Sequence, residues 1–357
     1  MNVTPPFRDA GTFDHRLRLP VPVALLAALS LTLTMPSFAA GPAYDFDRRE
    51  LESILDDLIA WLPGEWSSEP QLNYEHTVRM PAEGEHEQWY RTFAHIDAPQ
   101  IGPYVFYGQI NIASRDGPLF GRTQVLYTAS IDEARGAVLV RGQAMMDGER
   151  FVNLQDHPEL WNQVMINEPA INCDFLWRRD GEQLVGVLDG RTEDKRRNGP
   201  GTCTFMSKSG KEFYSDAEWV LGPETLWLYD INMLGGVRFN GREDRTHTRL
   251  GRARPYACRV EDASGRHTVS SYDRGGSGAV QSADGHALQW TLLRASYPAT
   301  DGFGLDDELR LVLHELESTQ PLDTAHAAPM ADRISLKARG IRVDCSREAK
   351  FGPLPAD

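Results

Sequence analysis

The sequence predicts a mainly β protein, in which an N-terminal helix and an antiparallel β-barrel are followed by a small β-sandwich. Three observations lead to this prediction. Short runs of β-branched and aromatic residues alternate with polar ones, turn residues separate the runs, and a single clear segment has helical periodicity. The 357 residues correspond to about two domains of roughly 150 residues each.

The helical segment begins at Asp47, whose side chain suits an N-cap, and Glu50 completes a capping box three residues later. Its apolar residues recur at the spacing of one helix face, at Leu51, Ile54, Leu55, Leu58 and Leu62. Pro63 and Gly64 end the segment. We therefore expect a helix that covers or flanks a sheet.

Strand signals dominate after this helix. The predicted strands of the first domain span residues 74–80, 88–95, 103–113, 123–131, 137–144, 174–178, 184–188, 203–207, 213–221, 225–231 and 245–250. A short helix is expected at 158–164, where Pro158 fits a first turn. An antiparallel meander of this length best avoids exposed edges by closing into a barrel.

The chain becomes richer in polar loops after about residue 254. Further strands are predicted at 256–260, 267–272, 288–295, 309–316 and 333–343, and the glycines of Gly276-Ser277-Gly278 indicate a loop. We therefore expect a barrel domain at 40–254, a small β domain at 255–347 and a tail at 348–357.

Residues 1–39 have the features of a secretory signal peptide. Arg16 and Arg18 precede an apolar run at 21–35, and Ser37-Phe38-Ala39 fits a cleavage site. The run is shorter than the roughly 20 residues of a spanning helix. The pattern predicts a periplasmic or secreted protein without a membrane span after cleavage, and an uncleaved N-terminal anchor is the alternative.

All four cysteines follow the predicted signal peptide, and an even number in an exported chain indicates disulfides. Three pairings are possible. Chain order and the domain division favour Cys173–Cys203 and Cys258–Cys345, and no pair has the spacing of metal ligands. A formal net charge of −14 argues against nucleic acid as the partner, because duplex binding requires clustered cations.

The stretch from the first helix to about residue 250 resembles the CpcT/CpeT family of bilin chromophore lyases. The matching pieces follow the family order: Trp61-Leu62-Pro63-Gly64-Glu65-Trp66, Ile96-Asp97-Ala98-Pro99, Val105-Phe106-Tyr107-Gly108-Gln109, the segment from Leu154 to Trp161, and Cys173-Asp174-Phe175-Leu176-Trp177. The resemblance implies a lipocalin-like barrel whose calyx holds a linear tetrapyrrole (bilin), and a protein that accepts the chromophore.

Candidate ligand-binding residues lie on three of the predicted strands of the first domain. Tyr107, Gln109 and Asn111 share one strand face, as do Arg122 and Gln124 on the next. If these faces line the calyx, they offer amides and a guanidinium for carboxylates, since arginine binds carboxylate in bidentate fashion. Trp177 is a candidate wall residue. The alternative is a solvent-facing polar surface and an ordinary core tryptophan.

The resemblance departs from the family at one chemical position. The family typically has a carboxylate where this chain has Gly108, which argues against lyase chemistry more than against ligand binding. No catalytic residue and no metal ligand is assigned. The leading hypothesis is binding of a small amphipathic molecule such as a bilin. A non-catalytic interaction or structural protein of the cell envelope is the alternative. A sugar hydrolase would rest only on the carboxylate pairs Glu85/Glu87 and Glu315/Glu317.

Overall fold

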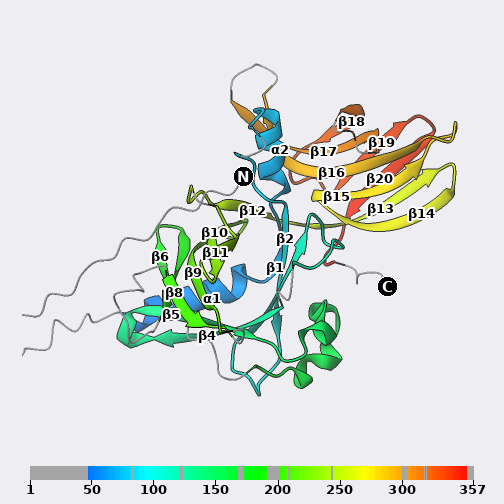
Figure 1. Ribbon diagram of the computed structural model, residues 1–357. Helices are drawn as coiled ribbons and strands as arrows, with labels where there is room; N and C mark the ends of the chain where they lie inside the picture. The colour runs from blue at the N-terminus through cyan, green and yellow to red at the C-terminus, as the bar shows by residue number, and fades with distance from the viewer. Residues whose placement is uncertain are drawn as a thin grey trace, which may run out of the picture. The chain divides into compact units, whose positions relative to one another are not determined.

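The computed structural model describes residues 47–81, 84–120, 124–167, 173–190, 202–207, 210–242, 244–299, 304–316, 318 and 320–351. The predicted signal peptide and Arg122 lie outside these residues. The protein is mainly β, as predicted, and its strands form one large sheet and two four-stranded sheets (Figure 1). The large sheet contains the residues of the predicted barrel.

Ten antiparallel strands of the large sheet form a closed barrel. Its strands are β1 (Gly64–Ser67), β2 (Trp89–Ile96), β3 (Val105–Ile112), β4 (Val125–Asp132), β5 (Ala137–Ala144), β6 (Cys173–Asp180), β7 (Gln183–Gly190), β9 (Glu212–Leu221), β10 (Thr225–Leu234) and β12 (Thr248–Arg252). They pair in this order, and β12 pairs with β1 to close the ring. Closure removes the free edges that an open meander would expose.

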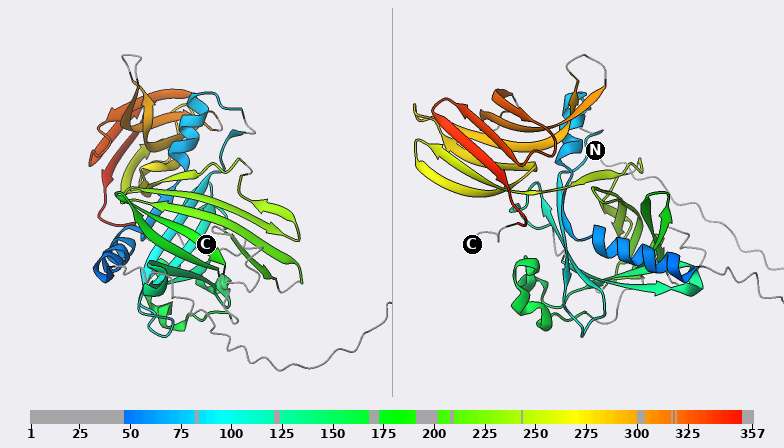
Figure 2. Two further views of the ribbon diagram at one scale, coloured as in Figure 1. Left: turned by 90° about the vertical axis from the view of Figure 1, so that its left-hand side faces the viewer. Right: turned by 180° about the vertical axis from the view of Figure 1, so that it is seen from behind.

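Two short strands extend one end of the barrel. The hairpin of β9 and β10 is paired along its full length, but β7 contacts only 218–221 of β9 and β12 contacts only 225–228 of β10. The rest of the hairpin pairs with β8 (Thr202–Met206) and β11 (Val237–Asn240). We call β8, β11, 212–217 and 229–234 the flap; it continues past the barrel strands (Figure 2).

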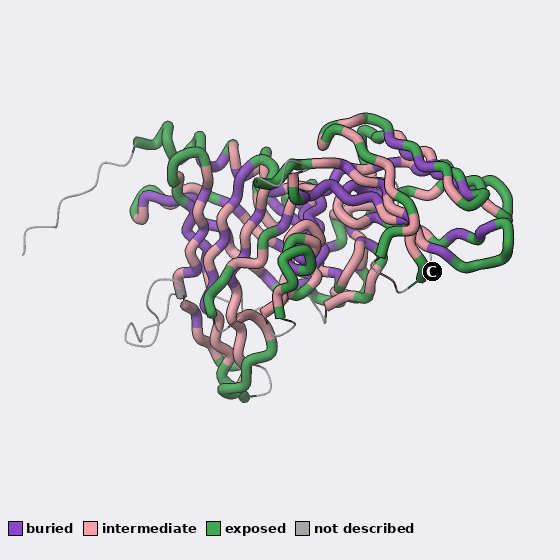
Figure 3. The backbone as a smooth tube through the Cα atoms, turned by 90° about the horizontal axis from the view of Figure 1, so that it is seen from above, coloured by how far each residue is buried: buried purple, intermediate pink, exposed green. Residues whose placement is uncertain are grey.

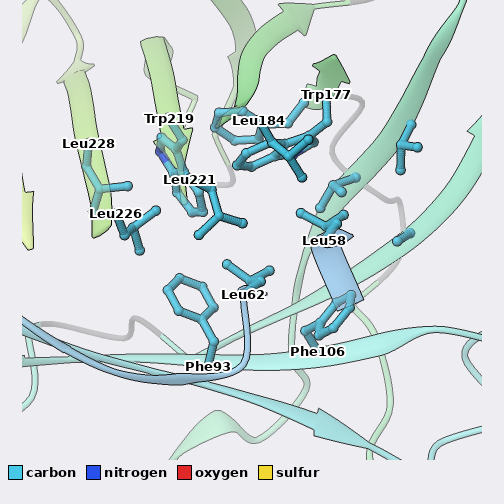
Figure 4. Close-up of a cluster of buried hydrophobic side chains, with 14 of the residues drawn as sticks. Leu58, Leu62, Phe93, Phe106, Trp177, Leu184, Trp219, Leu221, Leu226 and Leu228 are labelled. Carbon is cyan, nitrogen blue, oxygen red and sulfur yellow. The ribbon is translucent and has the colours of Figure 1, made fainter. Parts of the chain in front are cut away.

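The helix α1 (Arg48–Trp61) has the predicted N-cap, since the Asp47 side chain accepts a hydrogen bond from the backbone of Arg49. Its apolar stripe is buried and packs with the inward-facing strand residues. Figure 4 shows Leu62 between Phe93 of β2 and Leu221 of β9. Tyr104 and Ile131, next to the β2–β3 and β4–β5 hairpins, line a depression with α1. The helix therefore covers the end of the barrel opposite the flap.

The predicted strand at 74–80 is wrong, because this segment belongs to helix α2 (Glu69–Thr77). Ser68 stands at the N-cap and Pro70 lies in the first turn, where the fixed backbone angle of proline suits a helix. These start signals outweigh the strand preference of Tyr74 and Thr77. The predicted helix at 158–164 is the 3-10 helix η5 (Pro158–Gln163), one of three short 3-10 helices after β5, with η3 (Gly148–Phe151) and η4 (Leu154–Asp156).

The C-terminal strands form two sheets around one apolar core. One sheet contains β13 (Pro255–Asp262), β14 (Gly265–Tyr272), β19 (Arg333–Ala338) and β20 (Ile341–Arg347). The other contains β15 (Arg274–Gln281), β16 (Ala287–Pro298), β17 (Leu305–Glu315) and β18 (Pro321–Ala327). Side chains from both sheets meet in a core that includes Trp290, Leu311 and Val343, which is the predicted sandwich. Figure 3 shows buried segments running along these strands and those of the barrel.

The sandwich corrects two expectations. The glycine-rich segment is the strand β15, because Gly278 pairs with Trp290 and a Cβ at this glycine would lie 2.8 Å from the indole. Glycine is required there by packing rather than by a turn. The predicted strand at 333–343 is two strands, since Arg339 and Gly340 both have positive φ and form a tight turn. The boundary at residue 254 stays a prediction, because the described residues between 47 and 351 belong to one compact unit.

The cysteines pair as predicted. Cys173 of β6 bonds to Cys203 of β8, and Cys258 of β13 bonds to Cys345 of β20. The first bridge fastens the flap to the barrel wall. Two disulfides fit an oxidising compartment such as the periplasm or the extracellular space. Within the part of the chain that the structure describes, no helix is long and apolar enough to cross a membrane.

Candidate ligand-binding site in the barrel

Aromatic side chains fill the middle of the barrel. Trp219 lies at the centre, with ring centroids of Phe93, Tyr127, Phe175 and Trp177 between 4.8 and 6.4 Å from its own. Gly186 makes room for Trp177, because a Cβ at this glycine would lie 2.4 Å from the indole. The half of the barrel next to α1 is therefore occupied by the protein's own side chains.

A polar layer lies on the flap side of these aromatic rings. Arg91 of β2 donates from Nη2 to the Asp230 carboxylate of β10 at 3.1 Å, and Trp219 Nε1 donates to the other carboxylate oxygen at 2.9 Å. The guanidinium lies 5.7 Å from the Trp219 ring centroid, a cation–π distance. Both charged side chains are largely buried. The Arg91 Nε–H has no hydrogen-bond acceptor among the described residues.

Tyr127 faces the same layer. Burial raises the pKa of its phenol to about 12, and the opposite charges of Arg91 and Asp230 act on it in opposite directions. The phenol is therefore protonated at neutral pH. The Arg91 Nε–H and the Tyr127 hydroxyl offer donors and the Asp230 carboxylate offers an acceptor, with balanced charge. Such a layer suits a polar group that brings its own acceptor.

A pocket of about 120 Å³ opens beside this layer. Strand β1 lies between β2 and β12 and pairs with both, but it ends at Ser67. Beyond Ser67 no strand among the described residues joins β2 to β12, and the pocket lies at this interruption of the barrel wall. Its walls include Trp89 and Arg91 of β2, Leu228 and Asp230 of β10, and Asn240 at the end of β11. Residues before β2 and after β11 complete it: Glu85, Glu87, Arg242 and Thr246. Drug-sized ligands occupy pockets of roughly 300–1,000 Å³, so this pocket fits only part of such a molecule.

The flap places aromatic rings next to the pocket. Phe205 of β8 packs against the interior cluster and stacks on Phe213 of β9 at 4.6 Å, and Phe213 contacts Phe239 of β11 at 6.0 Å. Phe239 is half exposed and precedes the pocket residue Asn240. An apolar surface therefore leads from the barrel interior to the exposed flap.

A hydrogen-bonded clamp holds one rim of the pocket. The buried Glu75 carboxylate contacts His86 Nδ1 at 2.6 Å, and His86 Nε2 lies 3.2 Å from the Thr246 hydroxyl. This order resembles an acid–histidine–hydroxyl triad, but Thr246 donates its proton to Asp244 at 2.8 Å. The hydroxyl is therefore not activated by the histidine, and the clamp fixes α2 to the segment that precedes β12.

Four of the five predicted binding residues are described by the structure, and these four do not lie in one site. Phe106 belongs to the interior cluster, so its neighbour Tyr107 faces outward, and Gln109 shares that outer face. The Tyr107 hydroxyl, which has one proton to donate, lies 2.6 Å from Gln109 Oε1 and 2.9 Å from the Phe151 carbonyl, and Gln109 Nε2 donates to Asn153 Oδ1 at 2.8 Å. These contacts hold η3 and η4 on the barrel wall.

The remaining predicted residues are divided between the two faces. Gln124 is buried beside Gly148 outside the barrel, and its Nε2 has no acceptor among the described residues. Trp177 lies in the interior aromatic cluster. Arg122 lies outside the described residues. Of the predicted carboxylate pairs, Glu85 and Glu87 line the pocket, whereas Glu317 lies outside the described residues.

Arg91 and Asp230 are the site residues that sequence reasoning missed. A signal was present, since Arg91 shares its strand phase with Trp89 and Phe93, and a charge among large apolar residues indicates a paired interior group. The structure also explains Gly108. It faces inward, where a Cβ would lie 2.7 Å from the Tyr127 ring and 3.3 Å from Phe93. The space for a carboxylate side chain is taken by these rings.

Comparison with known proteins gives little guidance. No protein-family model matches the chain, and no curated protein matches it. Among solved structures, the chain is similar to the CRL protein of Arabidopsis, with 15% sequence identity and a TM-score of 0.37 over 57% of this chain and 97% of that one. In the described residues, no cluster of three or more His, Cys, Asp or Glu side chains has the arrangement of a metal site.

Proposed function

We propose that the barrel binds a small amphipathic molecule, whose polar group contacts Arg91 and Asp230 and whose apolar part lies against Phe205, Phe213 and Phe239. The observation that carries this proposal is the buried Arg91 Nε–H beside the pocket. A buried donor without a partner costs about 1–3 kcal/mol, so a ligand acceptor placed there gains that energy on binding. A carbonyl or carboxylate oxygen fits this role.

A linear tetrapyrrole is the ligand that the resemblance to bilin lyases suggests. Its carboxylates would accept hydrogen bonds from Arg91, its pyrrole N–H groups would donate to Asp230, and its conjugated rings would stack on the phenylalanines of the flap. The pocket of about 120 Å³ admits only one end of such a molecule, so the rest would extend over the flap. Lyase chemistry is not part of the proposal, because Tyr127 and Phe93 occupy the space at Gly108.

The alternative is a protein of the cell envelope that binds no small molecule. The aromatic cluster around Trp219 favours this alternative, because it fills the half of the barrel next to α1. In that case the flap and the sandwich would carry contacts with a protein partner.

The deciding experiment is a titration of the folded, disulfide-bonded protein with biliverdin. We expect a saturable red-shifted band and quenching of tryptophan fluorescence, since Trp89 lines the pocket and Trp219 lies below it. Arg91→Gln should weaken binding about tenfold or more through loss of a charge-assisted hydrogen bond. Arg178→Gln, on the outer wall where the side chain binds the Arg135 and Gly136 carbonyls, is the matched control.

Two results would contradict the proposed ligand site in the barrel. If biliverdin and a fatty acid both leave the spectra of the folded protein unchanged, the envelope interaction protein becomes the better account. If Arg91→Gln and Arg178→Gln bind equally well, the ligand lies elsewhere.

A further inference from the structure

A second concave surface lies away from the barrel pocket. It is a groove of about 480 Å³ between α2, β12 and the sandwich strands β15–β17. Three arginines line it, Arg249 of β12, Arg274 of β15 and Arg294 of β16. Apolar walls come from Pro70, Tyr74, Leu250, Leu305 and Pro329. The groove therefore combines guanidinium groups with apolar surface in a protein of net negative charge.

Two of the groove arginines, Arg274 and Arg294, belong to a cluster of four with Arg252 and Arg254 at the start of the sandwich. Arg294 donates to the buried Asp273 carboxylate at 2.7 Å, and Arg254 donates to Glu224 at 2.8 Å. These two arginines are neutralised by carboxylates. Among the described residues, the hydrogen-bond acceptors of Arg252 and Arg274 are main-chain carbonyls. Arg252 donates to those of Trp61, Pro63 and Pro223 and also lies 4.3 Å from the Trp66 ring centroid, and Arg274 donates to those of Arg252 and Arg294.

Arg274 is held in place by its surroundings. Its guanidinium lies flat on Gly251, where a Cβ would lie 2.8 Å from the guanidinium carbon, and Ser67 donates to its backbone carbonyl at 2.9 Å. Burial and the positive charge of Arg294 lower the pKa of Arg274 to about 10, so the side chain stays protonated at neutral pH. The negative charges of Asp273 and Glu224 act on Arg274 in the opposite direction, but no carboxylate among the described residues accepts a hydrogen bond from it, so the fixed guanidinium can still attract an anion.

The acidic groups near the groove are engaged elsewhere. Asp307 lines the opposite wall and accepts a hydrogen bond from Ser296 at 2.6 Å. Glu69 packs against Gly275 and is bound by the Gln88 side chain. Neither carboxylate forms an ion pair with Arg274. Arg249 is exposed, lines the groove and lies 4.8 Å from the Trp227 ring centroid, and stacking on a ring face does not use the N–H groups of a guanidinium.

We propose that this groove binds the carboxylate or phosphate group of a small molecule, held by Arg274 and Arg249, with an apolar portion against Tyr74 and Leu305. Arg294 contributes charge from behind, since its own donors are used by Asp273 and the Arg252 carbonyl. The site is separate from the barrel pocket and does not depend on the proposed barrel ligand.

The test uses octanoate and inorganic phosphate as probes, with octanol as the uncharged counterpart. Binding is followed by fluorescence of Trp227 under Arg249 and by side-chain NMR signals of the arginines. We expect saturable binding of at least one of the two anions and none of octanol. Octanoate alone would show that the apolar walls contribute, and phosphate alone would show that the charge suffices; either supports the site.

Variants locate the binding. Arg249→Gln, at an exposed position, should weaken anion binding about tenfold, which is the usual scale for a charge-assisted hydrogen bond. Arg274→Lys keeps the charge but loses the planar contact with Gly251, and should weaken binding further. Arg259→Gln, exposed on β13, is the control and should bind like the parent protein.

Three results would overturn the proposal. One is no saturable signal with either anion. Another is equal affinity in Arg249→Gln and Arg259→Gln, even if Arg274→Lys does not fold. The third is loss of anion binding in Arg91→Gln, which would place the anion in the barrel. Because Arg91→Gln tests the barrel and Arg249→Gln tests the groove, each site can fail without the other.

Discussion

Replacing Asp230 should destabilise the barrel strongly, because it leaves the Arg91 guanidinium buried without its charge partner. The Arg91 Nη2 and Asp230 Oδ2 atoms are 3.1 Å apart. At an effective dielectric constant of about 20, their attraction amounts to about 5 kcal/mol, and it offsets the cost of removing both charges from water. Asp230 also accepts the Trp219 N–H at 2.9 Å, worth about 1 kcal/mol.

We expect Asp230→Ala to lower the free energy of unfolding by about 3–5 kcal/mol, the range for breaking one half of a buried pair. The double variant Arg91→Met/Asp230→Leu removes both charges and should lose only about 1–2 kcal/mol, because just the Trp219 N–H is left without its acceptor. The difference between the double variant and the sum of the single variants Arg91→Met and Asp230→Leu measures the coupling.

The assay is urea unfolding of the disulfide-bonded protein, monitored by tryptophan fluorescence and circular dichroism. The variants are compared when the dependence of the unfolding free energy on urea concentration has the same slope as in the parent protein. The interpretation is refuted if Asp230→Ala costs less than about 1 kcal/mol, or if the double variant loses the sum of the two single losses. Either result would mean that water reaches the pair and screens it. Arg141→Met, whose partner Asp174 is buried but which is itself more exposed, provides a comparison on the outer wall.

Three further predictions follow from the geometry. Replacing both cysteines of a bridge by serine should lower the free energy of unfolding, because the unfolded chain gains entropy when the loop is opened. The loss is about 3.7 kcal/mol for Cys173–Cys203, which are 30 residues apart, and about 4.6 kcal/mol for Cys258–Cys345, which are 87 residues apart. A larger loss of thermal stability for the first bridge than for the second would contradict this treatment. The pKa of Tyr127 is about 12 in the folded protein and about 10 in an unfolded chain, so the stability that this residue contributes is complete below pH 10 and is lost as the pH rises from 10 to 12. A Tyr127→Phe variant should therefore lose less stability at alkaline pH in denaturant titrations. An unchanged loss of stability would count against burial of the phenol. Gly186→Ala should destabilise by about 1–3 kcal/mol, since its Cβ meets the Trp177 ring, while Gly148→Ala, with its nearest contact at 3.5 Å, should be close to neutral; equal melting temperatures would disprove the packing argument.

Much of the fold could be predicted because it depends on local signals. The apolar stripe and Asp47 N-cap defined α1, and alternation with turn residues located most barrel strands within a few residues of their observed bounds. Chain order was enough to pair the cysteines. The errors arose where a local signal was read without its packing partner: the glycines of β15 indicate a loop until Trp290 is seen against Gly278.

The candidate site depended on which face of each strand turns inward. Alternation shows that Tyr107 and Gln109 share a face, and that Trp89, Arg91 and Phe93 share another, but a shift of one residue would exchange inside and outside. Tertiary structure decides the matter, because Phe106 packs on α1 and forces Tyr107 toward η3. Asp230 lies 139 positions from Arg91, and only barrel closure between β10 and β12 brings the two charges together.

The sequence by itself therefore determined the mainly β class, the helix and its cap, and the pairing of cysteines, since each rests on periodicity, short-range capping or order along the chain. Only the tertiary structure decided which polar residues lie inside the barrel and where arginines meet at the sandwich, because these depend on register and closure between strands far apart in the chain.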